Sequence, residues 1–186
     1  MASWLSTHAP KRFDSLAMPD NLRNQFARIS KSGNLPHVLI TGPAGVGKTA
    51  TWRLIARQIL GPSWNATCHV LQARDLARQS GAMKTFEEFL RPTGIGSTDT
   101  LAGRTSLDAF DRKMWHNELD TAPCGEETDF VDGRLAVSRL IVIEDADHLG
   151  DRRQPYLRRM MESESRTTRF IFTARAPSRI IDALRS

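Results

Sequence analysis

The sequence has only two cysteines, Cys68 and Cys124, and they lie far apart in the chain. Two isolated thiols do not make the spaced clusters of a zinc knuckle or a disulfide framework, so we expect reduced cysteines with a structural role. No stretch reaches the roughly 18 to 20 uncharged apolar residues of a membrane span, and the chain does not begin with a basic and then apolar signal pattern. We therefore expect a soluble, intracellular protein without a membrane partner.

Internal repeats and nucleophile sets are also missing. No pattern recurs along the 186 residues, and no Ser/His/Asp or Cys/His combination has a spacing that predicts nucleophilic catalysis. Hydrophobic residues make up 40% of the chain and charged residues 25%, which excludes collagen-like and wholly disordered proteins. A chain of this size can bury one core and carry an insertion.

Positive charge is concentrated toward the end of the chain. The formal net charge is +5, and the last 37 residues hold nine arginines against four acidic residues. The first 149 residues are balanced, with 17 basic and 17 acidic residues. The last part of the chain is therefore where a surface for a phosphate-bearing partner is expected.

Apolar patterns predict strands that alternate with helices. Short apolar runs typical of buried strands occur over 37–41, 68–73, 140–143 and 169–174. Helical spacing predicts helices over 21–32, around 86–90 and over 152–163. It also predicts a helix that begins after the glycine turn of the first strand and stops at Gly61. This order predicts an α/β fold in which helices cover both faces of a parallel sheet, giving three layers. We expect a core over 21–186 with an insertion over 93–136.

A phosphate-binding motif lies between the first strand and the next helix. The segment fits G-x-x-x-x-G-K-[ST] at every fixed position and consists of Gly42, Pro43, Ala44, Gly45, Val46, Gly47, Lys48 and Thr49. The glycines let backbone N–H groups converge on an anion, and the helix directs its positive end to the same point. We predict that Lys48 reaches the β- and γ-phosphates of a bound nucleotide and that Thr49 ligates Mg²⁺. The N-terminal tail, residues 1–20, is expected to pack near this site.

Acidic residues follow the third predicted strand, at Glu144, Asp145 and Asp147. A parallel sheet presents ligand-binding groups at its carboxyl edge, so we predict that Glu144 serves the Mg²⁺ site and that Asp145 orients the attacking water. Lys48, Glu144 and Asp145 are the candidate catalytic residues. Such sites commonly have Asp first and Glu second. The reversed order changes the reach of both side chains by a methylene, and because phosphoryl transfer depends on positioning, we expect weak hydrolysis.

The predicted helix over 152–163 has an apolar side and a basic side. Leu157, Met160 and Met161 occupy one arc, and arginines project from the rest of the surface. Such a surface can neutralise phosphates without reading bases. The candidate residues for phosphate contacts of this kind are Arg152, Arg153, Arg158 and Arg179. A solvated helix surface with internal ion pairs, such as Arg158 with Glu162, is the alternative interpretation.

Read together, these segments resemble the small subunits of clamp loaders, the replication factor C branch of the AAA+ ATPases. The resemblance includes a Trp and a Pro separated by five residues, at Trp4 and Pro10, and it covers nearly the whole chain except 93–136. Further matching segments in the family's order lie at 34–37, 60–64, 145–147, 157–162 and 177–181. The chain departs from the family at His8 and Ala9, where a Tyr-Arg pair is usual, and at Arg175, where the polar sensor is usually Asn.

The resemblance implies an AAA+ P-loop ATPase core, without the lid and collar of the family in this chain. It implies ATP and Mg²⁺ as cofactors, and other clamp-loader subunits, a sliding clamp and primer-template DNA as partners. The helix similar to 152–163 faces duplex DNA in clamp loaders, so the resemblance implies that the candidate DNA-binding residues are Arg152, Arg153, Arg158 and Arg179. The implied function is to couple ATP binding and hydrolysis to loading the clamp onto that DNA during replication. The implied location is the nucleus of a eukaryote or the cytoplasm of an archaeon.

Two alternatives remain open at this point. The chain could be a hydrolysis-deficient structural subunit of a ring, which the reversed acids and Arg175 favour. It could also be another AAA+ ATPase of DNA replication, for example one that loads a helicase.

Overall fold

A parallel sheet of four strands lies at the centre of the computed structural model. The structure describes residues 8–32, 35–62, 64, 68–90, 121–126, 137, 139–163 and 168–185. The strand order is β1-β4-β3-β2, and every neighbouring pair is parallel. The strands are β1 (Val38–Thr41), β2 (Cys68–Gln72), β3 (Arg139–Glu144) and β4 (Thr168–Ala174). The predicted parallel α/β sheet is therefore confirmed.

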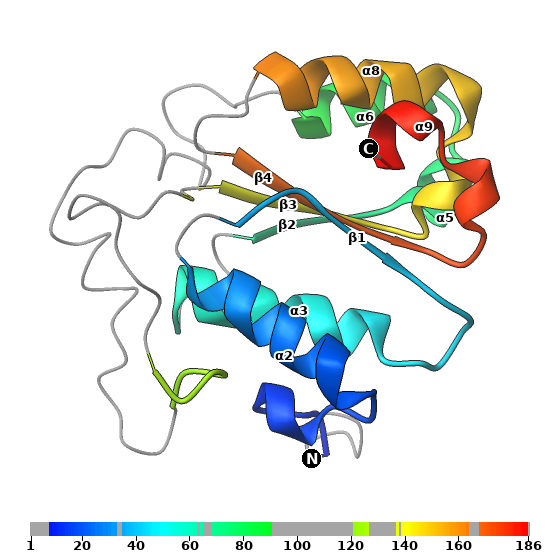
Figure 1. Ribbon diagram of the computed structural model, residues 1–186. Helices are drawn as coiled ribbons and strands as arrows, with labels where there is room; N and C mark the ends of the chain where they lie inside the picture. Colours follow the sequence, from blue (N-terminus) through cyan, green and yellow to red (C-terminus); the bar gives the residue numbers. More distant parts are fainter. Residues whose placement is uncertain are drawn as a thin grey trace, which may run out of the picture.

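Helices cover both faces of this sheet (Figure 1). One face packs against α2 (Asp20–Lys31) and α3 (Lys48–Leu60), with the short turn η1 (Phe13–Ser15) beyond them. The other face is covered by α5 (Ala73–Leu76), α6 (Ala82–Leu90), α8 (Gly150–Ser163) and α9 (Asp182–Arg185). Two more 3₁₀ turns connect elements, η3 (Ala146–His148) and η4 (Pro177–Arg179). The three-layer arrangement agrees with the prediction.

Strand β3 joins the two halves of the core. Its residues 140 to 143 are each 0% exposed, and their side chains alternate between the faces of the sheet. Leu140 and Val142 pack with α3, whereas Ile141 and Ile143 pack with α6 and α8. Each such side chain contributes roughly 1.5–3 kcal/mol by leaving water. This burial on both faces fixes the end of β3, and with it the position of Glu144.

Some predicted boundaries shift in the structure. Strand β2 ends at Gln72, because Ala73 already begins α5. Helix α8 begins at Gly150, two residues before the predicted start. Gly150 has φ +73°, a conformation that glycine adopts without strain, and it allows the chain to pass from η3 directly into the helix.

Part of the tail and part of the predicted insertion lie against α2 and α3. Phe13 and Leu16 are buried in the α3 side of the core, and the Phe13 N–H donates to the Pro123 carbonyl at 3.3 Å. Gln58 of α3 accepts from the Cys124 N–H at 2.9 Å and donates to the Glu126 carbonyl at 2.8 Å. Residues 1–7 of the tail, and the insertion apart from 121–126, lie outside the described residues.

Both cysteines are free thiols. Burial raises the pKa of Cys68 to about 12 and that of Cys124 to about 11, so both are protonated at neutral pH. None of the helices in the described ranges has the length and hydrophobicity needed to span a bilayer.

Candidate functional site

The glycine-rich segment forms the turn from β1 into α3. Gly45 and Gly47 have φ +83° and +91°, which side-chain-bearing residues rarely adopt. Gly47 is the residue just before α3, and its carbonyl accepts the first helical bond from the Thr51 N–H at 2.9 Å. The Gly42 N–H donates to the Ala174 carbonyl at 3.1 Å, which ties the start of the turn to the end of β4. The turn thus lies at the carboxyl edge of the sheet.

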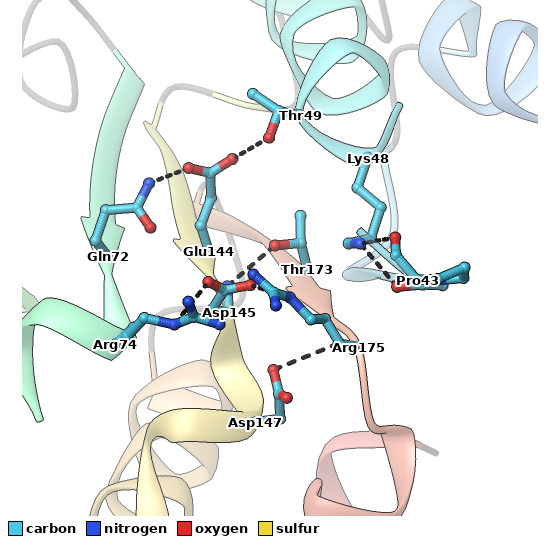
Figure 2. A network of polar contacts seen from close by, with 11 residues as sticks. Pro43, Lys48, Thr49, Gln72, Arg74, Glu144, Asp145, Asp147, Thr173 and Arg175 are labelled. Carbon is cyan, nitrogen blue, oxygen red and sulfur yellow. Dashed lines mark hydrogen bonds and ion pairs between the residues drawn. The ribbon is translucent and has the colours of Figure 1, made fainter. Parts of the chain in front are cut away.

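Lys48 is the first residue of α3 and lies over this turn (Figure 2). Its Nζ donates to the carbonyls of Gly42 and Pro43, at 2.7 Å in both cases. The ammonium group is therefore held inside the glycine turn, next to the start of the helix. This arrangement places a positive charge where the turn and the helix end both favour an anion.

Glu144 ends β3 and accepts hydrogen bonds from three side chains. Its Oε1 accepts from the Thr49 hydroxyl at 2.6 Å and from the Trp52 indole N–H at 2.8 Å. Its Oε2 accepts from the Gln72 amide, the residue that pairs with Glu144 in the β2–β3 register. The carboxylate consequently lies between α3 and β2, against the hydroxyl of the phosphate-binding motif.

Asp145 has a different environment (Figure 2). Its backbone lies in the left-handed region, with φ +52°, and its N–H donates to the Thr173 hydroxyl at 3.1 Å. Its carboxylate pairs with two arginines, with Arg74 Nε 3.5 Å from Oδ2 and Arg175 Nε 3.6 Å from Oδ1. The carboxylate is 20% exposed, so water screens these pairs only in part. Asp145 is thus neutralised by one side chain of α5 and by one that follows β4.

These groups surround one open cavity of about 370 Å³. Its walls come from the glycine turn, from the start of α3 and from the ends of β2, β3 and β4. The lining residues are Ala44, Gly45, Gly47, Lys48, Thr49, Gln72, Glu144, Asp145, Thr173 and Arg175. All three candidate catalytic residues, Lys48, Glu144 and Asp145, line this cavity.

The donor set fits magnesium. Mg²⁺ takes oxygen ligands and usually keeps several waters, binding through one or two protein groups plus substrate phosphates. The Thr49 hydroxyl and the Glu144 carboxylate bring two oxygens to within 2.6 Å of each other beside the glycine turn. Within the described ranges, no group of three or more His, Cys, Asp or Glu side chains could hold a metal ion alone. The two oxygens therefore suit an ion that is shared with phosphate.

A second cavity of about 480 Å³ lies between α2 and β1. Met18, which precedes α2, lines it together with Val46 and Lys48 of the phosphate-binding motif. Leu22, Phe26 and Ile29 of α2 supply an apolar wall. The end of the tail and the glycine turn thus face the same space.

The arginines predicted to contact DNA have unequal environments. Arg152 and Arg179 are exposed, whereas Arg158 is half-buried and pairs with Glu162 at 2.9 Å. Arg153 is half-buried and donates to the Leu149 carbonyl at 2.9 Å. The buried Gln154 amide links the two segments, since it donates to the Arg179 carbonyl and accepts from the Ile181 N–H, both at 2.8 Å. This link holds Arg179 beside α8.

Sequence reasoning missed four residues that contact the two acids. Trp52, Gln72, Arg74 and Thr173 were not among the predicted site residues. One signal could have found three of them. Gln72, Arg74 and Thr173 lie at or just beyond the ends of strands that flank β3, and such ends converge at one edge of a parallel sheet.

A parallel sheet with helices on both faces and a G-x-x-x-x-G-K-T turn opening a helix define a P-loop NTPase. The AAA ATPase domain family matches residues 19–172, and the chain belongs to this family. The fold is one that binds nucleotide.

Replication factor C small subunits are similar to nearly the whole chain. The subunit from Methanocella arvoryzae is 30% identical over 183 residues, which cover 98% of this chain and 45% of that protein. The subunit from Methanoregula boonei is 29% identical over 183 residues, with the same coverage of both. The chain thus spans less than half the length of these curated relatives. It is a member of the AAA+ ATPases that is similar to these small subunits.

A solved structure shares the fold at low identity. The Thermotoga maritima RuvB Holliday junction branch migration motor superposes with a TM-score of 0.59 at 14% identity, covering 95% of this chain and 45% of that one. At this identity the likeness supports the fold alone.

Proposed function

We propose that this chain is the ATP-binding core of a clamp-loader subunit. In this function it binds ATP with Mg²⁺ and, together with other subunits of a ring, uses ATP to load a sliding clamp onto primer-template DNA. The similarity to replication factor C small subunits over nearly the whole chain supports this function.

The observation that carries the nucleotide-binding part is the contact between Thr49 and Glu144 beside Lys48. Two oxygens suited to Mg²⁺ and one ammonium group line the same cavity as the glycine turn. Lys48 donates to two carbonyls of the turn. Phosphate oxygens carry more negative charge than carbonyls and would accept these hydrogen bonds more strongly. We therefore infer that Lys48 transfers its donors to the β- and γ-phosphates when ATP binds.

The base of the nucleotide is proposed to lie toward the second cavity. Met18 and the apolar residues of α2 face Val46 across this space. An apolar wall suits a planar base, whereas the charged cavity suits the phosphates. The tail would then contribute to nucleotide binding, as its predicted position implies.

Calorimetric titration of ATP tests nucleotide binding directly. In the presence of MgCl₂ we expect heat from the unsubstituted chain and none from Lys48→Ala. Lys84→Ala is the matched control, because Lys84 is an exposed lysine of α6 that pairs with Glu88 outside the cavity. Unchanged binding by a folded Lys48→Ala protein would refute the assignment.

Clamp loading needs a separate experiment. ATP turnover is measured with and without a sliding clamp and primed DNA, and co-purification with the clamp is tested in parallel. Stimulation of turnover by clamp and DNA supports the proposal. Binding of ATP without binding of a clamp supports another AAA+ role in replication.

A hydrolysis-deficient ring subunit is the second candidate. Asp145 stands where a water-orienting acid is expected, and its two carboxylate oxygens face Arg74 and Arg175. A carboxylate that is paired on both oxygens is less available to accept a proton from water. If the chain is such a subunit, Lys48→Ala should abolish ATP binding. The unsubstituted chain should then show no ATP turnover beyond that of Lys48→Ala.

A further inference from the structure

Glu144 needs more anchoring than the aspartate that is common at its position. Its extra methylene adds a rotatable bond, so its carboxylate loses more conformational entropy when it is held in one place. In the structure, the carboxylate is nevertheless held against the Thr49 hydroxyl at 2.6 Å. Two further side chains supply that anchoring, one from a helix and one from a strand.

Trp52 holds the carboxylate from the helix. It follows Thr49 by three residues in α3, so both side chains lie on the same side of this helix. The Trp52 indole N–H donates to the same Oε1 that accepts from Thr49. The ring is only 3% exposed and meets Trp64 edge to face, with centroids 6.0 Å apart. Packing thus fixes the donor, and Glu144 gives this buried N–H its acceptor.

Gln72 holds the carboxylate from the neighbouring strand. It is paired with Glu144 in the parallel register of β2 and β3, so the two side chains lie on the same face of the sheet. Its amide donates to Oε2 (Figure 2), whereas the Trp52 N–H donates to Oε1. Each carboxylate oxygen therefore has its own anchor, and rotation of the carboxylate away from Thr49 would break both.

We propose that Trp52 and Gln72 are positioning residues for the magnesium site, fixing the Glu144 carboxylate against Thr49 and thereby setting the Mg²⁺ dependence of nucleotide binding. This inference rests on the proposed nucleotide-binding function. Side chains that orient a ligand of a metal typically change metal affinity by about 10- to 100-fold when they are removed. Both side chains direct their hydrogen bonds to Glu144, so binding of nucleotide without metal should not depend on them.

The test is calorimetric titration of ATP at increasing MgCl₂ and in EDTA, with two variants. Trp52→Phe keeps a buried ring and removes the N–H. Gln72→Met keeps the length of an exposed side chain and removes the amide. For both variants we expect the MgCl₂ concentration that half-maximally tightens ATP binding to rise about tenfold or more, with unchanged affinity in EDTA. Gln79→Met, the same change at an exposed glutamine that follows α5 and does not line the cavity, is the matched control and should not shift this MgCl₂ concentration.

A Glu144→Asp background separates positioning from a general structural effect. The shorter side chain cannot keep its carboxylate at both anchors and at Thr49, so Trp52→Phe and Gln72→Met should add less than about twofold there. Equal shifts in both backgrounds would overturn the proposal, and so would unchanged Mg²⁺ dependence in the folded single variants. A shift in only one variant overturns the role of the other residue.

The outcomes distinguish this inference from the proposed function. If the unsubstituted chain binds no ATP at any MgCl₂ concentration, the proposed function fails and the inference fails with it. If it binds ATP with Mg²⁺ and the variants behave identically, only the inference fails. Circular dichroism reports whether Trp52→Phe folds. If that variant does not fold, Gln72→Met alone tests the positioning role, because Gln72 is exposed and its substitution should leave the fold intact.

Discussion

Arg175 Nε lies 3.6 Å from Oδ1 of Asp145, so a side chain that follows β4 neutralises the acid that follows β3. The Arg175 backbone is held in turn, because its N–H donates to the buried Asp147 at 3.4 Å. Arg74 completes the arrangement at 3.5 Å from the other oxygen. The site therefore combines an intact phosphate-binding turn with a second acid whose charge is already compensated.

Removing Arg74 tests whether this compensation slows hydrolysis. Arg74→Gln should raise ATP turnover by up to about fivefold, because a partly exposed ion pair contributes on the order of 1 kcal/mol and its loss frees one oxygen of Asp145. Steady-state phosphate release measures the turnover, and we expect the affinity for ATP to stay unchanged. Arg78→Gln, at an exposed arginine just after α5, is the control. Lower turnover in Arg74→Gln would contradict the interpretation.

The glycine turn has room for an added methyl group, but its backbone conformation disfavours any residue with a Cβ. A Cβ at Gly47 meets no atom within 4 Å, yet φ is +91°, so Gly47→Ala should lower the free energy of unfolding by roughly 1–2 kcal/mol. Gly81→Ala has the same open surroundings with φ +74° and should cost a similar amount. Urea denaturation measures both. Only Gly47→Ala should also weaken ATP binding, since Gly81 lies between α5 and α6; an equal effect of both on ATP would contradict this assignment.

His37 should make stability depend on pH. Burial, with help from Arg169 and Arg158, lowers the pKa of His37 below its usual 6.5, and its Nδ1 accepts from the Phe170 N–H at 3.2 Å. The unfolded chain then binds a proton more readily than the folded one. This contribution to stability is therefore full above about pH 6.5 and is lost as the pH falls through the lowered pKa.

The measurement is the urea midpoint at several pH values below neutral. His37→Gln should show a smaller decline on acidification than the unsubstituted protein, because glutamine can accept the same hydrogen bond without titrating. Comparing the two proteins removes the contribution of the carboxylates, which titrate in both. Parallel curves would show that His37 has no part in the pH dependence.

The exposed arginines near α8 should govern salt-dependent binding to DNA. If Arg152 contacts a phosphate, Arg152→Gln should weaken binding to primed duplex and reduce the slope of log K against log salt by about 1. Arg158→Gln should have less effect, because Arg158 already pairs with Glu162. Arg28→Gln, an exposed arginine of α2 on the opposite face of the sheet, is the control (Figure 1). Binding that does not respond to salt would contradict a phosphate-binding surface.

The pattern of strands and helices could be predicted because the signals are local. The apolar run over 140–143 predicted a strand buried on both faces, and the structure confirms it as the centre of β3. The end of β2 at Gln72 was harder to predict from the sequence. Ala73 is buried at the start of α5, and a buried alanine suits the last residue of a strand as well as the first residue of a helix. Apolar character is shared by both states, and only packing against the η3 region distinguishes them.

The sequence by itself determined the phosphate-binding turn. The glycines, the lysine and the threonine of this turn lie within eight consecutive residues, so their spacing in the sequence sets the geometry of the turn. Only the tertiary structure decided what surrounds the two acids. Thr49, Trp52 and Gln72 reach Glu144 from 95, 92 and 72 residues away in the chain, and Asp145 meets Arg74 of α5 and Arg175, which follows β4. A parallel sheet brings strand ends together whatever their separation in sequence, so the partners of a residue at that edge follow from strand order and register.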